Sequence, residues 1–456
     1  MARARNSRME SLLRELGWSQ EQLAARFRRV AAENGADELR TVTRSHVNQW
    51  LRGSRPSGRA PRILCETFSR GLGRLVTAPE IGLDADGEDL PQHTDPVMAL
   101  AELGSMELDR QRRQMLTGTA YSLAGLALAT GDRPAAQARQ PRRPASGGHT
   151  TAADVAGARE MMAFFSRRDQ RRGGGDGRAA LVAYLRTDIV AHLGRRFPGE
   201  QVRREMFSTA SELVYLCGWM SFDAGEHGLA QRYFTLGLHL AAEADDAPLA
   251  GHILRAMAHQ AVDLGHPRHA LALATASLEQ RRYTRATPRE RALLGVVHAR
   301  SLAAAGRKPE ALAALLRAEN DLADATTTGE DPGRVWFFGE ASLAHETACT
   351  LRDLGDLQAA EREFRRSVRT RRTQEFTRTH AVTLGYLGAL QARQGALEAA
   401  CTTWTRALET MDGVQSGRAR DTVIQMRRML TPFRGRGISA VMDLDARARE
   451  VLARVG

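Results

Sequence analysis

The sequence predicts an all-α protein made of a small N-terminal domain, a linker and a long C-terminal body of helical repeats. Three observations lead to this prediction. Apolar residues recur at the spacing of an amphipathic helix along most of the chain. After residue 207, a Gly followed five residues later by an Ala recurs five times. The charge is uneven, because residues 1–75 hold 15 Arg against 7 Asp or Glu in a chain whose net charge is +12.

Length and composition narrow the class of protein. A chain of 456 residues with 43% hydrophobic content has room for two or three domains, each with its own core. The four cysteines lie far apart among apolar neighbours, which indicates reduced core residues in a cytoplasmic protein. The sequence contains no HExxH motif, nucleophile elbow or dinucleotide fingerprint. We therefore expect a protein that is not an enzyme, with no catalytic residue, no metal site and no cofactor.

The first domain, residues 1–83, centres on a helix that is predicted to begin after Thr43. Thr43 is a good N-cap, and Val47, Trp50 and Leu51 share one apolar face at the i, i+3, i+4 spacing. A Gly and a Pro soon afterwards end the segment. Upstream, a Ser caps another short helix. The pair is typical of a helix-turn-helix whose second helix presents polar side chains away from the core.

Those polar side chains are of the types that grip or read a DNA duplex. Arg pairs with guanine edges, Asn and Gln pair with adenine, and Ser or Arg binds phosphate oxygens. With a Gln in the first turn of the upstream helix, the predicted DNA-binding residues are Gln20, Thr43, Arg44, Ser45, His46, Asn48, Gln49, Arg52 and Arg55. The alternative is an ordinary basic surface helix, which the concentration of positive charge in this domain disfavours.

The first domain resembles the XRE (Cro and lambda-repressor-like) helix-turn-helix family in two stretches, SQEQLA at 19–24 and TRSHVNQWLRGSRP at 43–56. This resemblance implies double-stranded DNA as a partner. The sequence departs from the family in the connection between the two helices, RRVAAENGADELRTV. That connection is long enough for additional helix and for a turn at Asn34-Gly35.

Residues 84–152 are predicted to form a linker. Its first part, up to residue 109, is acidic and contains no Arg or Lys, so we expect a solvated connector, with some helix around Met98 to Leu103 as an option. Its last part, from residue 132, is rich in Pro, Ala and Arg and is expected to be a flexible tether. The N-terminal head and the body would then not need to be rigidly coupled, and a signal between them would have to travel through contacts or oligomerisation.

Within the linker, a short apolar helix is expected in residues 113–130, burying Leu123, Leu126 and Leu128 on protein. It follows a pair of arginines and so resembles an export signal. Such a signal works at the N-terminus, and this run is shorter than the about 20 apolar residues that span a bilayer. We expect no membrane partner, and a peripheral membrane contact is the alternative.

Residues 153–456 are predicted to form an α-solenoid. The recurring pairs are Gly225/Ala230, Gly265/Ala270, Gly306/Ala311, Gly355/Ala360 and Gly395/Ala400. Gly allows a left-handed turn after one helix, and a small Ala lets the next helix pack closely. Each unit is therefore an antiparallel helix pair that stacks on its neighbours and leaves a concave groove. A Gly-rich stretch at 173–177 lacks the Gly-Lys-Ser/Thr of a nucleotide site, so we expect a flexible loop there.

The units, such as LGYLGALQARQGALEAACTTWTRAL at 384–408, resemble tetratricopeptide repeats (TPR). Together with QWLRGSRP in the head and GWMSFDAGEHGLAQRYF at 218–234, they resemble bacterial transcriptional regulators that join an XRE-type head to a TPR body. Such regulators include repressors of differentiation and secondary metabolism, and similar architectures sense a peptide in the repeat groove. The resemblance implies a regulator of this kind.

The first helix of each unit is predicted to line the groove. Aromatic side chains beside Arg in a concave helical surface are suited to binding a short peptide or protein segment. The predicted groove residues are Tyr215, Trp219, Arg255, His259, Arg300 and Tyr386, with Trp336, Phe337 and Glu346 close by. The alternative is that these aromatic residues fill the core between repeats.

We therefore expect a cytoplasmic, homodimeric transcriptional regulator that binds double-stranded DNA and whose TPR-like body oligomerises or senses a peptide or protein signal. The alternative is a non-enzymatic TPR adaptor whose DNA-binding head is vestigial. The two differ in whether the head binds DNA.

Overall fold

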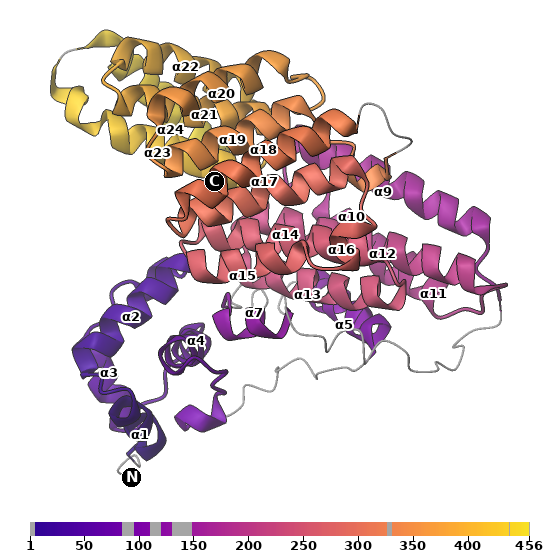
Figure 1. Ribbon diagram of the computed structural model, residues 1–456. Coiled ribbons are helices and arrows are strands. Elements are labelled where there is room, and N and C mark those ends of the chain that lie inside the picture. The colour runs from indigo at the N-terminus through magenta and orange to yellow at the C-terminus, as the bar shows by residue number, and fades with distance from the viewer. Residues whose placement is uncertain are drawn as a thin grey trace.

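A computed structural model describes residues 5–83, 95–109, 120–129, 148–325, 331–436 and 438–455. These residues are almost entirely helical, and the only β-type pairing among them is an isolated bridge between His149 and Arg196. The all-α prediction is confirmed. Figure 1 shows a small helical head beside a larger curved array of helices.

The head is built from four helices. They are α1 (Ser7–Glu15), α2 (Gln20–Glu33), α3 (Arg44–Leu51) and α4 (Ala60–Leu72), with 3-10 turns at Asp37–Leu39 and Pro79–Ile81. Ser19 and Gln22 form a capping box that starts α2. Phe27 of α2 packs on Trp50 of α3, with ring centroids 5.4 Å apart. The apolar face predicted for the second helix therefore lies in the core of the head.

The connection between α2 and α3 contains the turn that the sequence predicts. Asn34 is the C-cap of α2, and Gly35 has the left-handed φ of 60°. Two arginines hold this connection. The Arg28 guanidinium donates to the Val42 carbonyl over 2.7 Å, and Arg59 donates to the Gly35 carbonyl over 3.0 Å. These bonds fix the start of α3 relative to α2 although the connection is long.

The body contains five stacked antiparallel helix pairs, as predicted. They are α12 (Glu200–Asp223) with α13 (His227–Glu243), α14 (Ala247–Asp263) with α15 (Pro267–Ser277), α17 (Pro288–Ala304) with α18 (Lys308–Asp324), α19 (Glu340–Asp353) with α20 (Leu357–Thr370), and α21 (Thr377–Arg393) with α22 (Leu397–Thr410). The turn glycine of every pair has φ between 76° and 85°. The alanine five residues later is fully buried in every pair. The Gly of each repeat therefore forms the left-handed turn that the sequence predicts, and the Ala is buried where the two helices of the pair pack together.

Further helices extend the array at both ends. Before the first pair lie α9 (Ala152–Arg172), α10 (Arg178–Tyr184), a π-helical turn at Leu185–Ile189 and α11 (Val190–Leu193). Short helices are inserted at α16 (Arg281–Thr284) and Gly333–Val335. After the last pair come α23 (Gly417–Leu430), a 3-10 turn at Thr431–Arg436 and α24 (Ser439–Val455).

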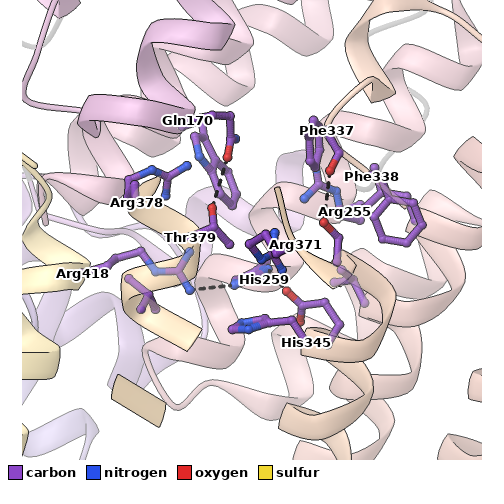
Figure 2. A pocket seen from close by; sticks show the side chains of 16 residues that line it. Gln170, Arg255, His259, Phe337, Phe338, His345, Arg371, Arg378, Thr379 and Arg418 are labelled. Atoms are coloured by element: carbon purple, nitrogen blue, oxygen red, sulfur yellow. Dashed lines mark hydrogen bonds and ion pairs between the residues drawn. The ribbon is translucent and has the colours of Figure 1, made fainter. Parts of the chain in front are cut away.

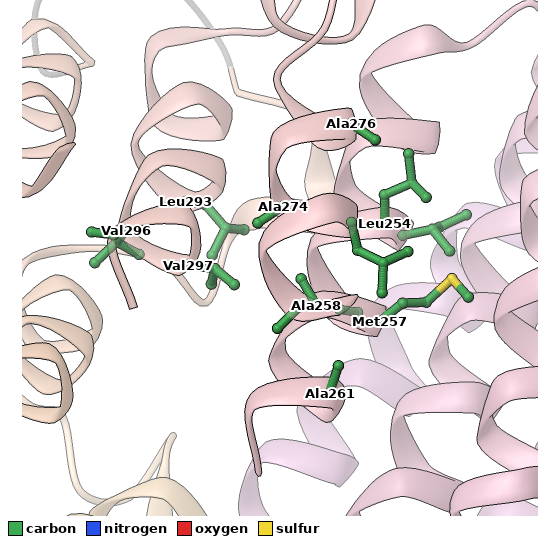
Figure 3. Close-up of a cluster of buried hydrophobic side chains, with 14 of the residues drawn as sticks. Leu254, Met257, Ala258, Ala261, Ala274, Ala276, Leu293, Val296 and Val297 are labelled. Carbon is green, nitrogen blue, oxygen red and sulfur yellow. The ribbon is translucent and has the colours of Figure 1, made fainter. Parts of the chain in front are cut away.

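A continuous apolar core runs between the pairs. Figure 3 shows part of it, where Ala258 of α14 and Ala274 of α15 lie toward Leu293 and Val297 of α17. Small residues on one helix face larger ones on the next, which is how stacked repeats bury a common core. The body is a TPR-like α-solenoid.

The linker is more ordered than the sequence suggests. Helix α5 (Pro96–Leu108) buries Val97, Leu100 and Leu103 against the body. Glu107 is only 4% exposed, pairs with Arg178 over 2.9 Å and accepts a hydrogen bond from Tyr233. Helix around Met98 to Leu103 is thus present, but the prediction that this segment is solvated is wrong. The acidic composition hid an apolar face whose partners lie far away in the chain.

The apolar helix expected in residues 113–130 is present as α7 (Leu123–Ala129), which Figure 1 shows between α4 of the head and α15 of the body. Leu126 is buried and Leu123 is half-buried. The paired arginines before it, the Leu128 side chain and most of the Pro-rich tether lie outside the described residues. Within the described part of the chain, no helix has the length and apolarity to cross a membrane.

The Gly-rich stretch is a tightly packed loop, so the prediction of a flexible loop there is wrong. A Cβ at Gly174 would lie 2.3 Å from the Met220 carbonyl oxygen, and one at Gly173 would lie 2.5 Å from that of Gln415. The Gly175 amide donates to the same Gln415 carbonyl over 3.0 Å. The glycines are needed because two distant segments of backbone approach each other here.

Candidate functional sites in the head and the groove

Helix α3 divides sharply into a buried and an exposed face. Val47, Trp50 and Leu51 are buried. Of the predicted DNA-binding residues, Thr43, Arg44, Ser45, His46, Gln49, Arg52 and Arg55 are exposed, whereas Asn48 and Gln20 are half-buried. The structure therefore gathers the polar residues of α3 on the surface of the head.

Thr43 caps α3 as predicted, and His46 has a structural role in this cap that the sequence did not reveal. The Thr43 amide donates to Nδ1 of His46 over 3.2 Å, and the Thr43 hydroxyl lies 3.0 Å from the same nitrogen. His46 therefore closes the first turn of α3 in the manner of a capping box. This contact orients the imidazole through its Nδ1.

The segment before α7 links the head to the body. On the head side, the Tyr121 amide donates to Asn34 over 2.6 Å, and the Leu123 amide donates to Glu66 over 3.0 Å. On the body side, Ser122 exchanges two backbone hydrogen bonds with the Gln231 side chain, at 2.8 and 2.7 Å. The head and the body are therefore joined by direct contacts at this point, although the linker alone did not require it.

Direct ionic contacts reinforce this junction. Arg70 of the head pairs with Glu33 over 2.5 Å and with Glu66 over 2.7 Å. Glu33 in turn lies 3.2 Å from Nε2 of His266 in the body. Burial opposes ionisation of Glu33, but its contacts with His266 and Arg70 outweigh that effect and lower its pKa. Burial dominates at Glu66, whose pKa is raised.

The body contains a cavity on the inner side of the repeat array. The first helices of the pairs contribute most of its lining, together with α9, α23 and the segment before α19. Its residues are Gln170, Trp219, Arg255, His259, Leu293, Val297, Phe337, Phe338, Ser342, His345, Glu346, Arg371, Arg378, Thr379, Val382 and Arg418. Figure 2 shows these side chains around the cavity.

The predicted groove residues fall into two layers. Trp219, Arg255 and His259 line the cavity itself, as do Phe337 and Glu346. The others lie behind this lining. Tyr215 accepts a hydrogen bond from Arg255 over 2.9 Å, Arg300 contacts His259 over 3.0 Å, and Tyr386 stacks on His345 with ring centroids 5.7 Å apart. Trp336 points elsewhere, because its indole donates to Ser166 over 2.9 Å.

Ion pairs neutralise two arginines of the lining, Arg378 and Arg418, and Arg300 behind it. Arg300 pairs with Asp263 over 2.7 Å and with Glu346 over 3.4 Å. Arg418 lies 3.6 Å from the second oxygen of Asp263. The sequence did not single out Arg418, Arg371 or Arg378, because arginine is common throughout the chain and only the fold shows which ones are buried.

Arg378 makes the longest-range of these pairs. It contacts Asp169 of α9 and Asp223 of α12, each over 3.1 Å. Burial raises the pKa of Asp169 to about 6 despite the pairing. Burial also lowers the pKa of His259 to about 4 and of His345 to about 3, so both imidazoles are neutral at pH 7. The positive charge of the cavity therefore comes from arginine.

Comparisons with known proteins cover both parts of the chain. Residues 9–84 match the family model described as the SP15 N-terminal domain, which spans the head. A search of curated proteins found no match. The solved structures that are similar include a Rap protein complexed with competence and sporulation factor. That similarity has a TM-score of 0.42 at 12% identity and covers 67% of this chain and 88% of the other. Likeness of this degree assigns no ligand or activity to the present chain.

Proposed function

We propose that this chain is a DNA-binding transcriptional regulator whose head binds duplex DNA through α3. The observation that carries the proposal is the division of α3 into two faces. One face is fixed on α2 by Trp50 and its neighbours, and the other presents Arg, Ser, Gln and Asn side chains. A rigid helix with such side chains on one face suits the major groove of DNA.

Charge supports the same proposal. The excess of arginine in residues 1–75 would attract the phosphate backbone. Gln20, at the start of α2, would contact a phosphate, while Arg44 and Gln49 would reach base edges. A homodimer would present two such helices to two half-sites, as in other helix-turn-helix proteins.

We propose in addition that the body binds a peptide or protein segment. The favouring observation is the cavity, in which aromatic side chains lie beside arginines on the first helices of successive repeats. The segment before α7, which contacts both the head and the body, would transmit the state of the groove to the head. This requires that the ligand binds differently to the DNA-competent and DNA-incompetent states.

The test is selection of duplex DNA from a random library by the full chain, followed by affinity measurements at several salt concentrations. If the head neutralises about five phosphates, log affinity should fall with log salt at a slope of about −4 to −5. Absence of selected sequences together with a flat salt dependence would refute DNA binding. It would leave the adaptor, in which the head is vestigial and the repeats recruit a protein.

A further inference from the structure

Two buried arginines in the cavity have no carboxylate partner among the described residues. Arg255 is 2% exposed and Arg371 is 7% exposed, and both line the same cavity. The other arginines there, Arg378 and Arg418, are close to Asp side chains. Arg255 and Arg371 have no such ion-pair partner among the described residues. This is unusual, because a buried cation is ordinarily paired with an anion.

The partners of Arg255 are all neutral. Its guanidinium donates to the Tyr215 hydroxyl over 2.9 Å and to Nε2 of His252 over 3.2 Å. Burial lowers the pKa of His252 well below its ordinary value, so this imidazole carries no charge. The guanidinium also lies 5.7 Å from the centre of the Trp219 ring. Its Nε is buried and has no hydrogen-bond partner in the described part of the chain.

Arg371, the C-cap residue of α20, is in the same situation. It donates to the Ala341 carbonyl over 2.9 Å and to the Ser367 hydroxyl over 3.1 Å, and its Nε likewise finds no described partner. Burial, with the nearby charge of Arg378, lowers the pKa of Arg371 to about 10, and the Glu346 carboxylate offsets these effects only in part. No ion pair joins Arg371 to a carboxylate of the described residues, so its charge is incompletely compensated.

We propose that Arg255 and Arg371 form a carboxylate-binding site that receives the anionic end of the ligand of the body. Arginine is suited to this because its planar donors match the two oxygens of a carboxylate. The inference rests on the proposed binding role of the body and specifies the chemistry of its ligand. A carboxylate would supply the negative charge that the two cations lack.

The size and walls of the cavity fit such a group. Its volume is about 70 Å³. Since a water needs about 10–15 Å³ on this measure, the space holds about five water-sized groups, such as a carboxylate with one or two methylenes. Phe337, Phe338 and Val382 supply apolar wall beside the arginines. The cavity therefore takes a terminal carboxylate or a short acidic side chain, and the rest of a peptide would lie along the neighbouring helices.

The experiment is thermal unfolding of the full chain with four probes, each compared with sodium chloride at equal ionic strength. The probes are sodium glutarate, a random peptide pool with free C-termini, the same pool with C-terminal amides, and an amidated pool enriched in Glu. Stabilisation by the free but not the amidated pool identifies a C-terminal carboxylate. Stabilisation by the Glu-rich amidated pool identifies a side chain, and stabilisation by glutarate alone identifies a small carboxylate.

Three variants decide whether the response arises at this site. Arg255→Met and Arg371→Met should weaken the apparent affinity for the effective probe by about tenfold or more, because each removes a charge-assisted hydrogen bond. Arg369→Met removes the same charge from an exposed position two residues away and should respond like the wild type. Neither substitution should unfold the protein, because each removes a buried charge that has no ion-pair partner. A weakened response to the probe in either variant alone is enough to place the response at this site.

No stabilisation of the wild type by any probe, or an equal response in the wild type and both cavity variants, would overturn the proposal. This measurement contains no DNA, so its failure leaves DNA binding by the head untouched. Conversely, loss of DNA binding would leave a carboxylate response intact. The two proposals can therefore fail separately.

Discussion

Tyr121, from the segment between the head and the body, stacks on His266 of the body with ring centroids 6.0 Å apart and planes 15° apart. The Tyr121 backbone is held from the other side by Asn34 and Arg70 of the head. A single fully buried side chain thus lies where the two parts of the molecule meet. We expect the stability of this junction to depend on it.

Replacement of Tyr121 by Ala should weaken the junction, at a cost of about 3–5 kcal/mol in the free energy of unfolding, as for other buried aromatic residues. Tyr121→Phe is the matched control. The Tyr121 hydroxyl is buried without a hydrogen-bond partner among the described residues, so its removal should be neutral or stabilising. Hydrogen exchange along α2 and α4 should rise in the Ala variant only. Equal exchange in both variants would show that the junction does not depend on this ring.

The two proposed classes of DNA contact should separate by mutation. Arg44→Ala and Gln49→Ala should each cost about 1–3 kcal/mol for the preferred sequence and reduce the discrimination between bases, because they remove base-edge contacts. Arg55→Ala, beyond the end of α3, should weaken binding to all sequences alike. Competition binding with a set of operator variants distinguishes these outcomes. Identical profiles for Arg44→Ala and Arg55→Ala would contradict the assignment of the reading face.

Acid should destabilise the body through its buried histidines. The pKa of His259 is lowered to about 4 and that of His345 to about 3, against about 6.5 in an unfolded chain. Their contribution to stability is therefore complete above pH about 6.5 and is lost as the pH falls toward 4, at about 1.4 kcal/mol per pH unit for each imidazole. Urea unfolding at several pH values between 7 and 5 measures this slope.

His345→Gln should reduce the slope, because the amide can still donate to Thr383, which His345 contacts over 2.9 Å, but takes up no proton. His149→Gln, at an exposed position, should leave the slope as it is. A slope that is unchanged by His345→Gln would show that acid acts elsewhere.

Removal of the Arg378 charge should be costly. Arg378→Met leaves Asp169 and Asp223 buried without their shared cation, which should cost about 3–5 kcal/mol. Arg365→Met breaks an exposed pair with Glu361 and should cost less than about 1 kcal/mol. Urea unfolding of the two variants gives both values. Similar costs would mean that the buried pairs contribute no more than a surface contact.

The fold was predictable where one residue type enforces one local geometry. Gly395 and Ala400 illustrate this, since the first makes a left-handed turn and the second permits close packing. The second helix of the head was predictable for a similar reason, because its cap and apolar face lie within a few residues of each other. In these cases the physical cause is local in the sequence.

The parts that could not be predicted depend on partners distant in the chain. Glu107 appeared to belong to a solvated acidic run, but its partners are Arg178 and Tyr233. Arg371 appeared to be one arginine among many, and only the fold shows that it lacks an anionic partner. The sequence correctly suggested that the first helices line a groove, but it could not show which arginines are uncompensated there.

The pair of Asp169 and Arg378 connects helices that are far apart along the array, α9 and α21. The Gln415 amide reinforces this closure by donating to the Arg172 carbonyl over 2.6 Å. In most solenoids each repeat contacts only its neighbours, so single repeats can unfold one after another under force. Here a direct contact joins α9 to α21 and holds the repeats between them together. We therefore expect a pulling experiment on the body to record one large rupture. Sequential release of single repeats would show that this contact does not bear the load.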